Sequence, residues 1–160
     1  MLRELALRSK AHWGYPSELI DAWRERCPVN AAYLAAYQLH VFECDAAVAG
    51  FFSFVQRDGR VWLEHFWLDP AYIGRGLGRQ MWHTAIDVGG RSGNVSFEIE
   101  ADPNAAGFYE AMGAVRTGAI SSSLDARRLL PLLRFHRHLR PRQAPPSQPA
   151  QGLCGVCASR

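Results

Sequence analysis

The sequence predicts a single α/β domain whose mixed central sheet joins an antiparallel meander to a parallel pair of strands, with helices on its faces. Three β-rich runs follow one another between residues 37 and 68 with only short turns between them. A helical run then separates strand 61–68 from strand 95–100, and a crossover of this kind places the two strands parallel. The chain has 160 residues and is 48% hydrophobic, which is enough for one buried core.

Two amphipathic helices are predicted before the first strand. Residues 2–13 repeat apolar side chains at a helical period, and Gly14 is expected to end this helix. Pro16 and Glu18 are typical of the first turn of a helix, so a second helix should run to about Arg26.

The meander is predicted from strands at residues 37–44, 48–56 and 61–68. Gly50 lies inside the second run and indicates a β-bulge there. Asp58-Gly59 separates the second and third runs, and this pair is a strong signal for a tight hairpin turn.

The crossover helix is predicted at residues 76–88, because Leu77, Met81, Ala85 and Val88 fall on one helical face. Gly89-Gly90 is expected to end it. The remaining predicted elements are strand 95–100, a short helix at 105–112 and strands 114–120 and 129–138.

A glycine cluster follows strand 61–68, and three phosphate-binding motifs compete to explain it. A P-loop needs Gly-Lys-Ser/Thr, which is missing from this segment. A dinucleotide fingerprint beginning at Gly74 needs a small residue where Arg79 stands, and it should follow the strand directly. The remaining alternative is an acyl-coenzyme A loop, in which backbone N–H groups and a helix N-terminus hold the pyrophosphate. The spacing of Gly74, Gly76 and Gly78 fits this motif best.

Two blocks of sequence resemble the GCN5-related N-acetyltransferases. They are LEHFWLDPAYIGRGLGRQMW and EADPNAAGFYEAMGAV, which occur in the family's order and about one crossover apart. The resemblance extends over roughly residues 5–138. The segments LALRSKAHWGYP and SSSLDARRLLPLL also resemble a bacterial branch of the family with no single assigned substrate.

This resemblance implies a role for each part of the two blocks. The strand ending Phe66-Trp67-Leu68 would splay from strand 95–100 and offer its main chain to the pantetheine arm of acetyl-CoA. Asn104 would contact the same arm, and Tyr109 would protonate the leaving thiolate. The pyrophosphate would be held by Ile73, Gly74, Arg75, Gly76, Leu77, Gly78 and Arg79, chiefly through backbone N–H groups. A core tyrosine is the alternative reading of Tyr109.

The chain departs from the family pattern at two points. Ile73 stands where the family has Gln or Arg, which removes one side-chain contact with the coenzyme. The strand that the family places before its first helix is also missing from the sequence, so we expect either a late start or a fold without that strand. Its absence would leave the edge of strand 37–44 unpaired, which favours association with a second copy as a homodimer.

Glu64 is the leading candidate for the general base. By strand alternation it should share a face with Trp62, Phe66 and Leu68, and such surroundings would raise the pKa of its carboxyl group. A solvent-facing or arginine-paired Glu64 is the alternative, with Glu100 or a bound water as the base. His65 should point away from Glu64, which favours a structural role for it.

The expected function is transfer of an acetyl group from acetyl-CoA to a primary amine by direct attack in a ternary complex. The acceptor, a small-molecule amine or a peptide or protein amine, is not selected by any charge pattern in the sequence. The alternative is a module that binds acyl-CoA without turnover. Acetyl-CoA is the expected co-substrate and no metal is expected, because Cys154 and Cys157 lack a second close pair of ligands.

Charge is distributed unevenly along the chain. Residues 1–126 carry 11 basic and 15 acidic side chains, whereas residues 127–160 carry seven arginines and no acid. We read residues 1–139 as the catalytic domain and residues 140–160 as a disordered Pro-rich tail, so nucleic acid is not an expected partner. The chain has no long apolar run and no signal-peptide core, which predicts a cytoplasmic protein without a membrane partner.

Overall fold

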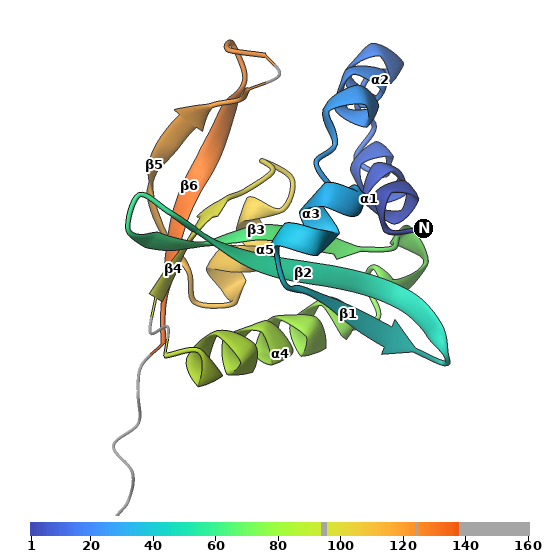
Figure 1. The fold of residues 1–160 in the computed structure, drawn as a ribbon. Helices are drawn as coiled ribbons and strands as arrows, with labels where there is room; N and C mark the ends of the chain where they lie inside the picture. Colours follow the sequence, from blue (N-terminus) through green and yellow to red (C-terminus); the bar gives the residue numbers. More distant parts are fainter. Residues whose placement is uncertain (94–95, 124, 138–160) are drawn as a thin grey trace, which may run out of the picture.

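The computed structural model describes residues 1–93, 96–123 and 125–137, and within them the strands form one mixed six-stranded sheet (Figure 1). Its order is β1-β2-β3-β4-β6-β5, with β3 and β4 parallel and the other neighbours antiparallel. The predicted fold class is therefore confirmed. The strands are β1 (Leu39–Cys44), β2 (Ala47–Arg57), β3 (Arg60–Leu68), β4 (Ser96–Glu100), β5 (Val115–Ser121) and β6 (Leu129–His136).

Helices cover both faces of the sheet. Figure 1 shows α1 and α3 on one side of β1–β3 and α4 on the opposite side. The short helix α3 was not predicted; its N-cap is Asn30, whose side chain accepts a hydrogen bond from the Tyr33 N–H at 3.0 Å. The helices are α1 (Leu2–Ala11), α2 (Ser17–Arg26), α3 (Ala31–Ala36), α4 (Leu77–Arg91) and α5 (Ala106–Ala111), with a 3₁₀ turn, η1 (Pro70–Tyr72), between β3 and α4.

The alternation of side chains along β2 divides the interior into two hydrophobic clusters. Phe52 points to the side of α4 and α5, where Trp82 is the largest fully buried side chain. Phe51 points to the other side, where it packs with Leu5 and Ala6 of α1. The sheet is therefore sandwiched between the crossover helix and the N-terminal helices, and its central strand β3 is fixed from both sides.

The glycine pair at positions 89 and 90 does not end α4, contrary to the sequence prediction. The helix continues to Arg91. A Cβ at Gly89 would lie 3.6 Å from the Phe54 ring, and the Arg137 guanidinium packs directly against Gly90. The two glycines therefore serve close packing of the helix against β2 and the end of β6. Gly93, with φ of 80°, provides the left-handed turn that follows the helix.

Gly50 lies where β2 and β3 approach each other closely. The bulge predicted at Gly50 occurs one residue earlier, because Phe42 faces Gly50 while Glu43 faces Val48, leaving Ala49 without a partner. A Cβ at Gly50 would lie 2.5 Å from the carbonyl oxygen of Trp67. Only glycine fits this contact.

Replacing Gly50 by alanine is expected to lower the free energy of unfolding by about 2 kcal/mol, because the new methyl group must displace the β3 main chain. Urea unfolding followed by circular dichroism measures the change. Gly107→Ala is the matched control, since a Cβ there would meet nothing within 4 Å and the residue lies inside α5. Equal stability of the two variants would contradict this account of Gly50.

Several further sequence features concern the cysteines, membrane spans and the ends of the described segments. Cys27 and Cys44 are free thiols. No helix in the described part of the chain is long and apolar enough to cross a membrane. Val95 and His138, predicted to begin and end strands, lie outside the described residues, as do the predicted domain boundary at 139, the tail and Cys154 and Cys157.

Candidate active site

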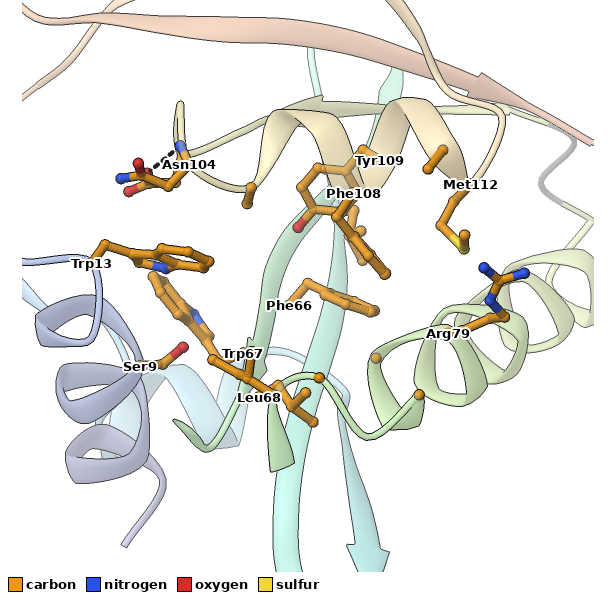
Figure 2. A pocket seen from close by; sticks show the side chains of 18 of the residues that line it. Ser9, Trp13, Phe66, Trp67, Leu68, Arg79, Asn104, Phe108, Tyr109 and Met112 are labelled. Carbon is orange, nitrogen blue, oxygen red and sulfur yellow. Dashed lines mark hydrogen bonds between the residues drawn. The ribbon is translucent and has the colours of Figure 1, made fainter. Parts of the chain in front are cut away.

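A cavity of about 420 Å³ lies between β3, the start of α4 and α5 (Figure 2). It brings together most of the site residues predicted from sequence. Those that line it are Glu64, Phe66, Trp67, Leu68, Ile73, Gly74, Gly76, Gly78, Arg79, Asn104 and Tyr109. Two predicted residues do not line it: Leu77 is buried beneath the loop, and the Arg75 guanidinium lies 5.2 Å from the centre of the Tyr72 ring.

The glycine loop forms one end of this cavity. Asp69 begins the preceding 3₁₀ turn by accepting a hydrogen bond from the Ala71 N–H at 3.1 Å. Gly74 and Gly76 then adopt φ values of 77° and 79°, and Gly76 is the N-cap of α4. A Cβ at either glycine would meet nothing within 4 Å. The loop is therefore open to a ligand, with the first N–H groups of α4 behind it.

A β-bulge in β3 places Glu64 at the cavity. His65 faces Ser53 on β2, and Leu63 faces Phe54, so Glu64 has no partner on β2. The extra residue interrupts the alternation of side chains along the strand.

The bulge bears on the expectation that Glu64 shares a face with Trp62, Phe66 and Leu68, because regular alternation does not hold through the register shift. Leu63 belongs to the hydrophobic cluster beneath α4, and Phe66 and Leu68 pack against the same cluster. Glu64 follows Leu63 directly, at the point where the register shifts, and lines the same cavity as these residues. Its carboxylate is near Arg57, with 3.9 Å between Oε2 and Nη1, which corresponds to the arginine-paired alternative.

The pKa of the Glu64 carboxyl is nevertheless raised, which is the predicted direction. Burial is the main cause; the charge of Arg57 opposes the rise and that of Glu100 adds to it. The Glu64 side chain is 30% exposed, so it remains reachable from the cavity. Glu100, the reserve candidate, does not line the cavity and accepts a hydrogen bond of 2.6 Å from Arg57.

The two parallel strands diverge beside the cavity. Trp62 faces Glu98, and this is the one facing pair between β3 and β4 among the described residues. Further along β3, residues 66–68 pair with β2 on one side only. The side of their main chain that is turned toward β4 is therefore available to hydrogen-bond a ligand.

Tyr109 points into the cavity from α5. Its ring packs against Phe66 and Trp82, with centroid distances of 5.9 and 5.7 Å, and Figure 2 shows its hydroxyl directed into the open space. The hydrogen bonds of the described residues include none to this hydroxyl. Burial, and secondarily the charge of Asp102, raise the pKa of Tyr109 well above its usual range.

A polar network beside Asn104 was not predicted. Asp102 Oδ2 lies 2.6 Å from Lys10 Nζ and 3.0 Å from Arg128 Nη2, while its Oδ1 accepts the Tyr15 hydroxyl at 2.7 Å. Asn104 donates to the Tyr15 hydroxyl at 2.9 Å. Burial would raise the pKa of Asp102, but Lys10 and Tyr15 lower it to about 2.

This network connects α1, the loop after it, the segment that follows β4 and the turn that precedes β6. Its members are far apart in the sequence and form no motif, so pattern analysis could not connect them. The one local signal was Asp102, whose carboxylate accepts the N–H of Asn104 at 3.0 Å in a turn. Since Asn104 contacts the network directly, its orientation at the cavity depends on these distant residues.

His65 is buried at the opposite face of β3 and is expected to make the fold sensitive to acid. It is 4% exposed, its Nδ1 accepts the Trp67 indole N–H at 3.2 Å, and burial lowers its pKa to about 4. In the unfolded chain the imidazole of His65 has the ordinary pKa of about 6.5. The stabilisation from neutral His65 is therefore complete above that pH and is lost as the pH falls toward 4, by about 3 kcal/mol.

Urea unfolding between pH 7 and pH 4 measures this dependence. The His65→Leu variant should have a flatter profile over this window, because the other titrating groups are common to both proteins. A variant whose pH dependence matches that of the natural chain would contradict the assignment to His65.

Comparison with known proteins places the chain in a family. A sequence model described as the acetyltransferase (GNAT) family matches residues 2–114. A search of curated proteins gives no match.

Solved acetyltransferases share the fold at low sequence identity. A GCN5-related N-acetyltransferase from Rhodopseudomonas palustris is 19% identical, with a TM-score of 0.71 over 84% of this chain and 87% of its own. A PaiA N-acetyltransferase from Thermoplasma acidophilum, in complex with coenzyme A, is 16% identical, with a TM-score of 0.64 over 84% and 90%. A GNAT family acetyltransferase from Elizabethkingia anophelis with acetyl-CoA bound is 14% identical, with a TM-score of 0.60 over 85% and 90%. The match over most of the described residues establishes that this chain belongs to the acetyltransferase (GNAT) family.

Proposed function

We propose that this protein transfers the acetyl group of acetyl-CoA to a primary amine by direct attack in a ternary complex. The observation that carries the proposal is that a glycine loop at a helix N-terminus, a strand edge without a partner among the described strands, a carboxylate and a buried phenol all line one cavity. Membership of an acetyltransferase family supports acetyl-CoA as the donor.

The coenzyme would lie along the α4 side of the cavity. The N–H groups of the loop 73–79 would bind the pyrophosphate, assisted by the dipole of α4 and by Arg79. The exposed edge of residues 66–68 would hydrogen-bond the pantetheine amides, and Asn104 would contact the same arm. Because this binding is mainly through the backbone, Ile73 is compatible with it.

Glu64 would accept the proton that the amine loses as it attacks the thioester carbon. The new C–N bond forms as the proton passes to Glu64, directly or through a water. The C–S bond then breaks, giving an amide and a thiolate. A carboxyl with a raised pKa is a stronger base than an ordinary glutamate, which suits it to this step. Holding both substrates in one cavity supplies much of the remaining rate.

Tyr109 would donate its proton to the departing thiolate. Its raised pKa keeps the phenol protonated at neutral pH, and its hydroxyl is directed into the cavity (Figure 2). Return of the Glu64 proton to solvent and of a proton to Tyr109 completes the cycle with amide and free thiol as products.

The acid limb of the pH profile is expected to follow the charges around Glu64. Because Arg57 lowers the pKa of Glu64 and Glu100 raises it, Arg57→Met should move the limb to higher pH and Glu100→Gln to lower pH. The quantity to measure is kcat/KM for acetyl-CoA with the amine in saturating excess, so that the amine's own titration is common to all variants. Arg116→Met, which removes a surface partner of Glu110, should leave the limb in place. Shifts in the same direction for both site variants would count against Glu64 as the base.

The proposal is tested by combining coenzyme binding with turnover. Calorimetric titration with acetyl-CoA should show one site, and thiol release should require both acetyl-CoA and an amine. Binding without amine-dependent release would favour a sensor or interaction module over an enzyme. Absence of binding would contradict both functions.

A further inference from the structure

We infer that the amine acceptor is a small, singly charged amine attached to an aromatic or alkyl group, such as an arylalkylamine, and not a polyamine or an amino acid. This inference rests on the proposed function. The evidence for it is the set of side chains at the end of the cavity away from the glycine loop.

That end of the cavity has aromatic walls. Trp13, which follows α1, and Trp67 of β3 project into the space on the α1 side, with Phe66 and Tyr109 across from them (Figure 2). Trp13 is 39% exposed and lies on the outer side of this wall. An organic group next to the amine would thus meet ring surfaces on several sides.

Trp67 is held in one orientation. Its indole N–H is donated to His65 Nδ1 at 3.2 Å, and its ring packs against Trp23 with 5.2 Å between centroids. The hydrogen-bonding group of the ring is therefore already used inside the protein. Trp67 offers a ligand an apolar surface in a fixed position, which favours a hydrophobic substituent over a polar one.

The charges at the cavity exclude a second cationic group. Glu64 and Asp102 are the carboxylates among the described residues that line it. Asp102 is already paired with Lys10 at 2.6 Å and Arg128 at 3.0 Å. Glu64, whose Oε2 lies 3.9 Å from Arg57 Nη1, is the carboxylate that remains to attract an ammonium group, and it must release that role when it acts as base. A diamine or polyamine would bury a further positive charge without a partner.

The charged side chains at the cavity also disfavour an acceptor that carries a carboxylate. Arg79 is the one cationic side chain among the described residues that line the cavity. It lies on α4 beside the glycine loop, away from Trp13 (Figure 2). A carboxylate near the reacting amine would lie close to Glu64, and the nearby cation, Arg57, is already shared between Glu64 at 3.9 Å and Glu100 at 2.6 Å. Like charges at this distance repel and reduce binding.

A panel of matched amines tests the inference. Phenylethylamine and phenylalanine differ in a carboxylate, phenylethylamine and ethylamine differ in a ring, and hexylamine and cadaverine differ in a second ammonium group. We expect kcat/KM to be about tenfold or more higher for the first member of each pair. Thiol release at fixed acetyl-CoA gives the rates, and mass spectrometry identifies each amide.

Trp13→Ala localises the effect to the aromatic wall. It should lower kcat/KM for phenylethylamine about tenfold, change the value for ethylamine less than about twofold, and leave the KM for acetyl-CoA unchanged. Leu34→Ala is the control, because this side chain is similarly exposed, on α3, and does not line the cavity. An equal loss for both amines would contradict a role of Trp13 in binding the substituent.

The outcomes separate this inference from the proposed function. Preference for cadaverine or phenylalanine would overturn the acceptor class while leaving acetyl transfer to amines in place. Coenzyme binding without acetylation of any amine in the panel would overturn the proposed function, and the acceptor class with it.

Discussion

Replacing Glu64 by glutamine is expected to lower kcat/KM about 10³-fold, because the amide has the shape of the carboxylate but cannot accept the proton of the attacking amine. The acetyl-CoA affinity should stay within about twofold of the natural value, since Glu64 is not part of the glycine loop or of the strand edge at residues 66–68 that would hold the coenzyme. Steady-state thiol release and calorimetric titration measure the two quantities separately.

Glu110→Gln is the control for this substitution. Glu110 is a surface residue of α5 that pairs with Arg116 at 3.1 Å and does not line the cavity. Its loss should leave both quantities unchanged. If Glu64→Gln reduces kcat/KM by less than about threefold, the base must be another group, and Glu100 or a bound water would be the next candidate.

Replacing Gly76 by alanine is expected to weaken acetyl-CoA binding about 100-fold, equivalent to about 2.7 kcal/mol. Gly76 has a φ of 79° as the N-cap of α4, and a Cβ there would project into space that no protein atom fills. The methyl group would therefore both strain the loop and keep the pyrophosphate away from the N–H groups. Calorimetric titration of the purified variant gives the change in Kd.

Gly59→Ala separates the effect on the ligand from the effect of backbone strain. Gly59 has a similar φ of 71°, in the β2–β3 hairpin, and an added Cβ would also meet nothing within 4 Å. Both alanines should destabilise the fold by about 1 kcal/mol, but only the change at Gly76 should weaken binding. Similar affinities for the two variants would show that the loop does not hold the coenzyme.

Much of the fold could be predicted from local patterns. The three β-rich runs with Asp58-Gly59 between the last two gave the meander, and both central residues of that turn adopt positive φ. The apolar period from Leu77 to Ala85 gave α4, and the spacing from Gly74 to Gly78 placed an open loop at its start. These features depend on neighbouring residues, so the sequence displays them directly.

The remaining features depend on contacts between distant segments. The bulge at Glu64 arises from the register of β3 against β2, which strand alternation alone does not reveal. The Gly89-Gly90 pair predicts the end of a helix from local sequence. In the structure the helix continues, and Phe54 and Arg137 pack against the two glycines. The Lys10–Asp102 pair joins α1 to the end of β4 across 92 positions of sequence. Each of these three features is determined by tertiary packing, which overrides the local sequence preference.

The most direct test of the central claim is a mass balance for acetyl transfer with phenylethylamine and acetyl-CoA labelled with ¹³C at the acetyl carbonyl. Carbon NMR should show the label moving from the thioester to an amide at a rate that depends on protein concentration, with one free thiol formed for each amide. Label that remains in the thioester, or that appears as free acetate with no amide, would contradict the assignment of this cavity as the site of N-acetyl transfer.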